Sequence, residues 1–115
     1  MAAPDPALGN LLDLHGQVLV IDEAGYWVRF VVHRVPATAA KPHGLDYSLT
    51  LHGPDGERLM GFDNAHAVAG ARGPALDHRH RLANVRFYEY SNAADLVAHF
   101  WAAVESVMRE KGVWP

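Results

Sequence analysis

The sequence predicts an α+β fold, in which an antiparallel sheet of about five strands carries a long C-terminal helix on one face. Two observations lead to this expectation. Apolar residues alternate with polar ones in two pairs of segments that are each joined by a short turn. The last part of the chain instead repeats apolar residues at helical spacing.

The first predicted hairpin joins residues 17–21 to residues 26–35 through the turn "DEAG". In its second strand one face holds mainly large apolar side chains, and the other face alternates with it. The expected core face is formed by Tyr26, Val28, Phe30 and Val32.

The second predicted hairpin joins residues 45–53 to residues 58–64 through the turn "GPDGE". The strand over 45–53 has the most regular alternation in the chain, with Leu45, Tyr47, Leu49 and Leu51 on one side. Gly61, inside the returning strand, indicates a bulge or a close approach of two backbones.

Residues 65–84 show no periodicity and are predicted to form a long loop. A fifth strand is expected over 85–90, and Asn92 is expected to cap the helix that follows. The apolar stripe of this helix consists of Leu96, Val97, Phe100, Val104, Val107 and Met108. Residues 1–14 are expected to be a loosely structured lead-in or a short helix.

The composition predicts one domain over residues 1–115 and limits the functions to consider. A net charge of −3 argues against a generally basic nucleic-acid-binding protein, and the absence of cysteine excludes disulfides and thiolate chemistry. We find neither a secretory signal pattern nor an apolar run of about 20 residues that would span a bilayer. We therefore expect a cytoplasmic protein, and no motif for a known cofactor is present.

Titratable side chains gather in "GFDNAH" (61–66) and "LDHRHR" (76–81). The candidate catalytic residues are His78, His80, Asp63 and Arg79, and the candidate substrate-binding residues are Arg81, Arg86, Asn64 and His66. If residues 77–81 are extended, the two histidines lie on one side and the arginines on the other. Four of the ten basic residues lie between positions 72 and 86, which favours an anionic ligand.

The cluster has three alternative interpretations. The two histidines are suited to acid–base cleavage of a phosphodiester, with an arginine holding the phosphate. They are also suited to holding a metal, with Asp63 or His66 as a third ligand. In the third interpretation they are solvated loop residues. On the neighbouring strands, Trp27 is expected to face a partner, and an open sheet edge would allow a homodimer to form.

Six segments in order resemble the TumE-type toxin family of bacterial toxin–antitoxin systems, from about residue 17 to 108. They are "HRVP" (33–36), "YSL" (47–49), "GFDNAH" (61–66), "DHRH" (77–80), "YEY" (88–90) and "LVAHFWAAVE" (96–105). The resemblance maps the family's motif residues onto Arg34, Asp63, Asn64, Asp77, His78, His80 and Trp101. Phe62 stands where the family usually has Tyr, and His99 stands where an Asp commonly precedes Phe-Trp.

The resemblance implies a toxin that a cognate antitoxin protein binds and neutralises. We expect a metal-independent ribonuclease that acts on RNA. In this hypothesis His78 and His80 are the acid and base, Asp63 orients one of them, and Arg79, Arg81 or Arg86 stabilises the phosphate. The alternative is a non-enzymatic protein-binding module or an inactive relative of the toxins.

Overall fold

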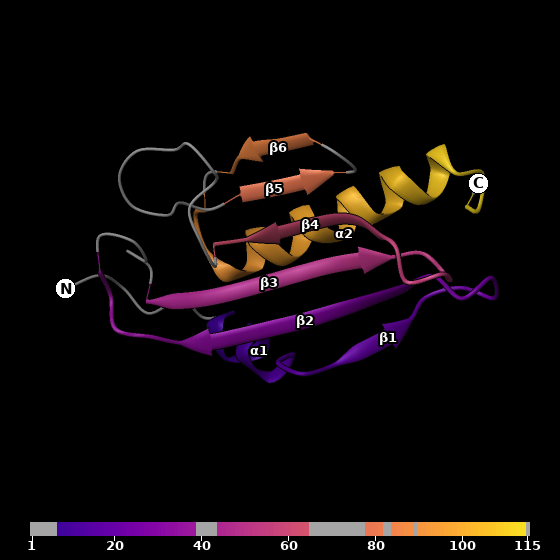
Figure 1. The fold of residues 1–115 in the computed structure, drawn as a ribbon. Coiled ribbons are helices and arrows are strands. Elements are labelled where there is room, and N and C mark those ends of the chain that lie inside the picture. The colour runs from indigo at the N-terminus through magenta and orange to yellow at the C-terminus, as the bar shows by residue number, and fades with distance from the viewer. Residues whose placement is uncertain (1–6, 39–43, 65–77, 82–83, 89, 115) are drawn as a thin grey trace.

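The computed structural model describes residues 7–38, 44–64, 78–81, 84–88 and 90–114, and for 78–81 and 84–87 it describes the backbone alone. These residues form a sheet that is covered on one face by a long helix (Figure 1). The elements are α1 (Leu8–Asp13), β1 (Val18–Val20), β2 (Trp27–Arg34), β3 (Leu45–His52), β4 (Arg58–Asp63), β5 (His78–Arg81), β6 (Asn84–Phe87) and α2 (Ala93–Glu110).

The sheet is antiparallel throughout and its strands follow the chain in the order β1-β2-β3-β4-β5-β6. Such a meander needs only short connections between neighbouring strands. The Asp22 carboxylate closes the first turn, because it accepts hydrogen bonds from Gly25 N at 3.2 Å and Tyr26 N at 2.9 Å. The second turn is closed between Gly53 N and Glu57 O at 2.9 Å.

The core lies between α2 and the sheet face that the sequence predicts to be apolar. Phe100 of α2 contacts two strands there, with ring centroids 5.6 Å from Phe30 and 6.3 Å from Phe62. The short helix α1 adds Leu11 to the same core. The predicted core positions of β2 and β3 are confirmed, since these side chains are buried: Val28, Phe30, Val32, Leu45, Tyr47, Leu49 and Leu51.

The predicted cap of the long helix is also confirmed. Asn92 Oδ1 accepts a hydrogen bond from Asp95 N at 2.9 Å, which satisfies one of the free N–H groups of the first turn. The expected stripe is buried apart from Val97, which is half-buried, and it also includes Ala93 and Ala103. The predicted α+β class is therefore confirmed.

The expected loop over 65–84 is corrected at its C-terminal end. Residues 78–81 form β5, which pairs with β4 and β6, so the described part of the chain contributes six strands to the sheet rather than about five. The sequence "HRHR" has no apolar alternation, and its strand conformation is defined by backbone pairing on both sides. The last strand runs from 84 to 87 rather than from 85 to 90.

Candidate functional site on the far face of the sheet

The far face, which we define as the sheet face away from α2, carries polar side chains. Those the structure describes on β2 to β4 are Trp27, Arg29, His33, Asp46, Ser48, Thr50, His52, Arg58 and Asp63. Two of these side chains are buried although α2 covers the opposite side of the sheet: Thr50 is 7% exposed and Asp63 is 4% exposed. The far face therefore includes a buried hydroxyl and a buried carboxylate.

A β-bulge brings Arg58 and Asp63 to this face together. They are five positions apart in the sequence, so in a regular strand they would lie on opposite faces. The register shifts between Leu51 and His52, where Met60 pairs with Leu51 but Arg58 pairs with His52. The extra residue, Leu59, is buried in the core, and the bulge moves Arg58 to the far face.

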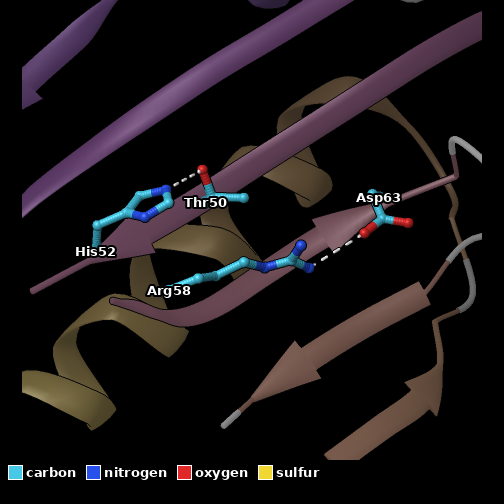
Figure 2. Close-up of polar contacts among 4 residues, drawn as sticks. All are labelled: Thr50, His52, Arg58 and Asp63. Atoms are coloured by element: carbon cyan, nitrogen blue, oxygen red, sulfur yellow. Dashed lines mark hydrogen bonds and ion pairs between the residues drawn. The ribbon is translucent and has the colours of Figure 1, made fainter. Parts of the chain in front are cut away.

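As a result, Arg58 Nη2 lies 3.4 Å from Asp63 Oδ2 (Figure 2). The Arg58 side chain is 44% exposed and the Asp63 side chain 6% exposed. A half-exposed cation thus reaches a buried carboxylate along the surface of β4.

His52 is the last residue of β3, where it pairs with Arg58, and three contacts hold its ring. Its ring stacks on Trp27 with centroids 4.0 Å apart and planes 9° apart. Nε2 is 2.9 Å from the Thr50 hydroxyl, a contact drawn in Figure 2, and Nδ1 is 3.4 Å from Gly56 O. If Nδ1 carries the proton and donates to Gly56, Nε2 accepts from Thr50.

Burial lowers the pKa of His52, and the positive charges of Arg58 and Arg29 lower it further. The hydrogen bond to the Gly56 carbonyl opposes this and raises the pKa. The net effect favours the neutral imidazole, which agrees with a ring that is stacked and accepts a hydrogen bond.

Asn64, predicted to bind substrate, has a fully buried side chain. Its Nδ2 donates to Leu45 O at 2.8 Å and its Oδ1 accepts from Tyr47 N at 2.9 Å. The amide thus pairs with the backbone of β3 just beyond the last residue of β4.

The register of β5 gives the positions of the two candidate histidines. His78 pairs with Asp63 and His80 pairs with Gly61, and paired positions of an antiparallel ladder belong to the same face. Both histidine positions therefore belong to one face, as the alternation in the sequence predicts, and the register shows that this is the far face. His66 and Asp77 lie outside the described residues.

The same register assigns the arginines to the other side of the sheet. Arg79 pairs with Phe62 and Arg81 pairs with Met60, two core residues, and Arg86 pairs with Arg79. All three arginine positions belong to the helix side. Among the described side chains, the arginines that share the far face with the histidine positions are Arg29 and Arg58, which the sequence did not single out.

A metal site was one interpretation of the sequence. Among the residues with described side chains, no group of three or more His, Asp or Glu is placed to hold a metal ion. The candidate third ligand His66 falls outside that part of the chain.

No helix in the described ranges combines the length and apolar character that a membrane span requires.

Sequence reasoning missed one further contact on the helix side. The Tyr88 hydroxyl lies 2.7 Å from Nδ1 of His99, with the rings edge to face. Tyr88 follows β6 and His99 belongs to α2, and no pattern in the sequence connects residues 11 positions apart in different elements.

These observations define a small α+β protein with an antiparallel meander, one covering helix and a polar sheet face. A family model described as toxin TumE matches residues 13–108, which is most of the chain. The chain belongs to this toxin family, and it is accordingly the toxin component of a toxin–antitoxin system. A search of curated proteins and a search of solved structures found no match.

Proposed function

We propose that the protein inhibits growth by cleaving RNA without a metal, and that the far face between β4 and β5 is the active site. The observation that supports this most directly is the register of β5, which puts His78 opposite Asp63 and His80 opposite Gly61. A carboxylate, two imidazoles and a guanidinium then belong to one face within two strands.

The cleavage needs two proton transfers that two imidazoles near neutral pH are suited to perform. One imidazole takes the proton of the RNA 2′-hydroxyl while its oxygen attacks the phosphorus. The other gives a proton to the departing 5′-oxygen as the P–O5′ bond breaks. The products are a 2′,3′-cyclic phosphate and a 5′-hydroxyl, and His78 and His80 share the roles of base and acid.

Asp63 is proposed to orient His78, its partner across the ladder. A buried carboxylate beside an imidazole fixes the tautomer and stabilises the protonated ring, which raises the effectiveness of the pair. Arg58 already contacts Asp63, so it also restrains the carboxylate.

The charge on the phosphate is proposed to be stabilised by Arg58, with Arg29 next along the face. The sequence hypothesis gave this role to Arg79, Arg81 or Arg86. Those three positions belong to the helix side in the register of β5 and β6. Arg58 is on the same face as the two histidine positions and contacts Asp63, so it is the cation proposed to stabilise the phosphate.

The test is induction of the wild type and of a His78→Ala/His80→Ala variant in a bacterial culture, with RNA integrity followed in each. We expect the wild type to arrest growth and degrade RNA and the double variant to do neither, because loss of acid–base catalysis costs about 10²–10⁴-fold per group. The matched control is His33→Ala, at an exposed position of β2, and we expect this variant to retain toxicity.

The chemistry has its own readout. Purified protein in EDTA is expected to leave 2′,3′-cyclic phosphate and 5′-hydroxyl ends. Cleavage that stops in EDTA, or that leaves 5′-phosphates, contradicts the metal-independent mechanism. A folded double variant that arrests growth as the wild type does contradicts the assignment of the histidines.

A second candidate function is a non-enzymatic protein-binding module, and an edge strand favours it. The residues of β1 are exposed, at 55% for Val18, 40% for Leu19 and 69% for Val20, and among the described strands β1 pairs with β2 alone. Such an edge accepts an added strand. We propose that the cognate antitoxin binds there.

Val20→Lys tests the antitoxin surface, because a charge on the edge opposes strand addition. We expect weaker binding of the antitoxin in a pull-down and unchanged toxicity of the variant alone. Binding that equals the wild type removes β1 from the interface. Toxicity that survives in the His78→Ala/His80→Ala variant but depends on β1 favours the binding module over the ribonuclease.

A further inference from the structure

A pair of aromatic rings on the far face has no role in the proposed cleavage mechanism. Trp27 of β2 pairs with His52 of β3 in the register, and their rings are stacked with centroids 4.0 Å apart and planes 9° apart. Neither residue belongs to the hydrophobic core, which lies on the other face of the sheet. Both residues are half-buried, so part of the ring pair is open to solvent.

The orientation of the His52 ring is fixed by contacts at both of its nitrogens. Nε2 lies 2.9 Å from the Thr50 hydroxyl and Nδ1 lies 3.4 Å from Gly56 O. Figure 2 shows the imidazole pointing toward Thr50 along β3. Side chains that already hold their bound orientation lose little conformational freedom when a ligand binds. The ring pair is therefore a preformed flat surface for a second aromatic group.

Two arginines with described side chains flank the ring pair. Arg58 pairs with His52 across β3 and β4, and Arg29 follows Trp27 by two residues on the same face of β2. Arg29 is exposed, and the Arg58 side chain is 44% exposed. Both lower the pKa of His52, as positive charges close to an imidazole do. Their positive charge beside the rings favours an anionic ligand.

The ring pair also lies close to the proposed catalytic positions. Gly61 pairs with Thr50 on one side and with His80 on the other, so these three positions form one row across the sheet. His52 follows Thr50 by two residues, which is about 7 Å along a strand. An RNA chain bound at the histidine positions therefore passes within reach of Trp27 and His52.

We infer that Trp27 and His52 form a stacking site for a nucleobase of single-stranded RNA, and that Arg29 and Arg58 bind the adjoining phosphates. The inference rests on the proposed function for the choice of RNA as the ligand. Aromatic rings beside cationic side chains are a common means of holding single strands. Because every base has a π face, the site holds a nucleotide near the cleaved bond with little regard to its sequence.

The test measures binding of a short 2′-O-methyl RNA oligonucleotide, whose blocked 2′-oxygen cannot attack the phosphorus. An abasic strand of the same length keeps the phosphates but has no bases to stack. Binding is followed by tryptophan fluorescence and, independently, by the anisotropy of a dye on the oligonucleotide. The variants are Trp27→Phe, Trp27→Ala and Arg29→Gln, and Arg109→Gln is the matched control for charge, at the last turn of α2.

We expect the wild type to bind the oligonucleotide more tightly than the abasic strand, with quenching of its tryptophan fluorescence. Trp27→Ala is expected to weaken binding of the oligonucleotide about 5–150-fold, the range found when one stacking residue is replaced by alanine. Trp27→Phe keeps a ring that stacks, so we expect it to bind nearly as the wild type does but without the fluorescence change. This rescue by phenylalanine separates stacking from a purely structural role of the indole.

The salt dependence of binding tests the phosphate contact. An arginine bound to a phosphate of a single strand contributes about 0.7 to the slope of log affinity against log salt. We expect Arg29→Gln to lower the slope by about that amount on both strands, and Arg109→Gln to leave it unchanged. Arg29 is chosen because Arg58 also contacts Asp63. An unchanged slope in Arg29→Gln contradicts the phosphate contact.

The wild type alone can overturn the stacking site, so the test does not depend on the folding of a variant. Equal affinity of the wild type for the two strands, with unchanged tryptophan fluorescence, contradicts stacking. A folded Trp27→Ala variant that binds RNA as the wild type does but no longer binds the antitoxin shows that the ring pair is a protein interface, and the inference fails.

The stacking site and the ribonuclease fail in different ways. If the bases add affinity through Trp27 but RNA with free 2′-hydroxyls stays intact, the stacking site stands and the ribonuclease fails. If the wild type and Trp27→Ala cleave dilute RNA at equal rates, the ribonuclease stands and the stacking site fails.

Discussion

The guanidinium of Arg58 lies against the backbone of Gly61. A β-carbon built at position 61 would be 3.2 Å from Arg58 Nη2 and 3.1 Å from Leu49 O. These distances are tighter than ordinary van der Waals contact, so a side chain at position 61 would require the guanidinium or its neighbours to shift. The missing side chain lets Arg58 extend along β4 as far as Asp63 (Figure 2).

Gly61→Ala is therefore expected to destabilise the protein by about 1–3 kcal/mol, the usual cost of adding a methyl group to a filled site. Urea unfolding measures the change. Gly9→Ala is the matched control, because a β-carbon at Gly9 of α1 meets nothing within 4 Å. Alanine there is expected to be neutral or stabilising, since it favours helix. Equal stability of both variants contradicts the close approach.

A double-mutant cycle measures the contact between Arg58 and Asp63. With Arg58→Gln and Asp63→Asn we expect a coupling free energy of about 0.5–1 kcal/mol, because one partner is buried and the other half-exposed. The exposed pair formed by Glu105 and Arg109 on α2 is the control, with an expected coupling of about 0.3–0.5 kcal/mol. A coupling of zero for Arg58 and Asp63 shows that the contact adds no stability.

Asn64→Ala is expected to cost at least about 2 kcal/mol of stability, because it removes the partners of two backbone groups of β3. Thermal or urea unfolding gives the value. Asn10→Ala, at an exposed position of α1, is expected to change stability by less than about 0.5 kcal/mol. A small effect at Asn64 shows that water or a neighbour takes over its hydrogen bonds.

The lowered pKa of His52 predicts a loss of stability in acid. The unfolded chain takes up a proton on this histidine near pH 6.5, whereas the folded protein does so only at lower pH. The stabilising contribution of His52 is thus complete above about pH 6.5 and is lost as the pH falls through the folded pKa.

We expect His52→Gln to flatten the dependence of unfolding free energy on pH between about 7 and 5, in urea unfolding at several pH values. At pH 8 the variant reports only the lost contacts with Trp27 and Thr50, so the difference between pH 8 and pH 5 isolates the proton. A variant with the wild-type slope contradicts the assignment to His52.

The elements with strong periodicity were predictable from the sequence. The core face of β3 and the stripe of α2 repeat at the spacing of a strand and a helix, and Asn92 is a residue that caps helices by its own chemistry. β5 could not be predicted in this way, because "HRHR" alternates two polar residue types and its strand conformation follows from pairing with β4.

The candidate site was likewise predictable from the sequence only in part. The alternation of His and Arg determined that the histidines and arginines of β5 would lie on opposite sides if that segment were extended. The tertiary structure decided which side each took, through the pairing of His78 with Asp63 and of Arg79 with Phe62. It also brought Arg58 to the far face by a bulge, and Tyr88 to His99 by packing α2 on the sheet. Alternation depends only on residues that are neighbours in the sequence. Strand register, bulges and the placement of the helix depend on contacts between residues that are far apart in the sequence.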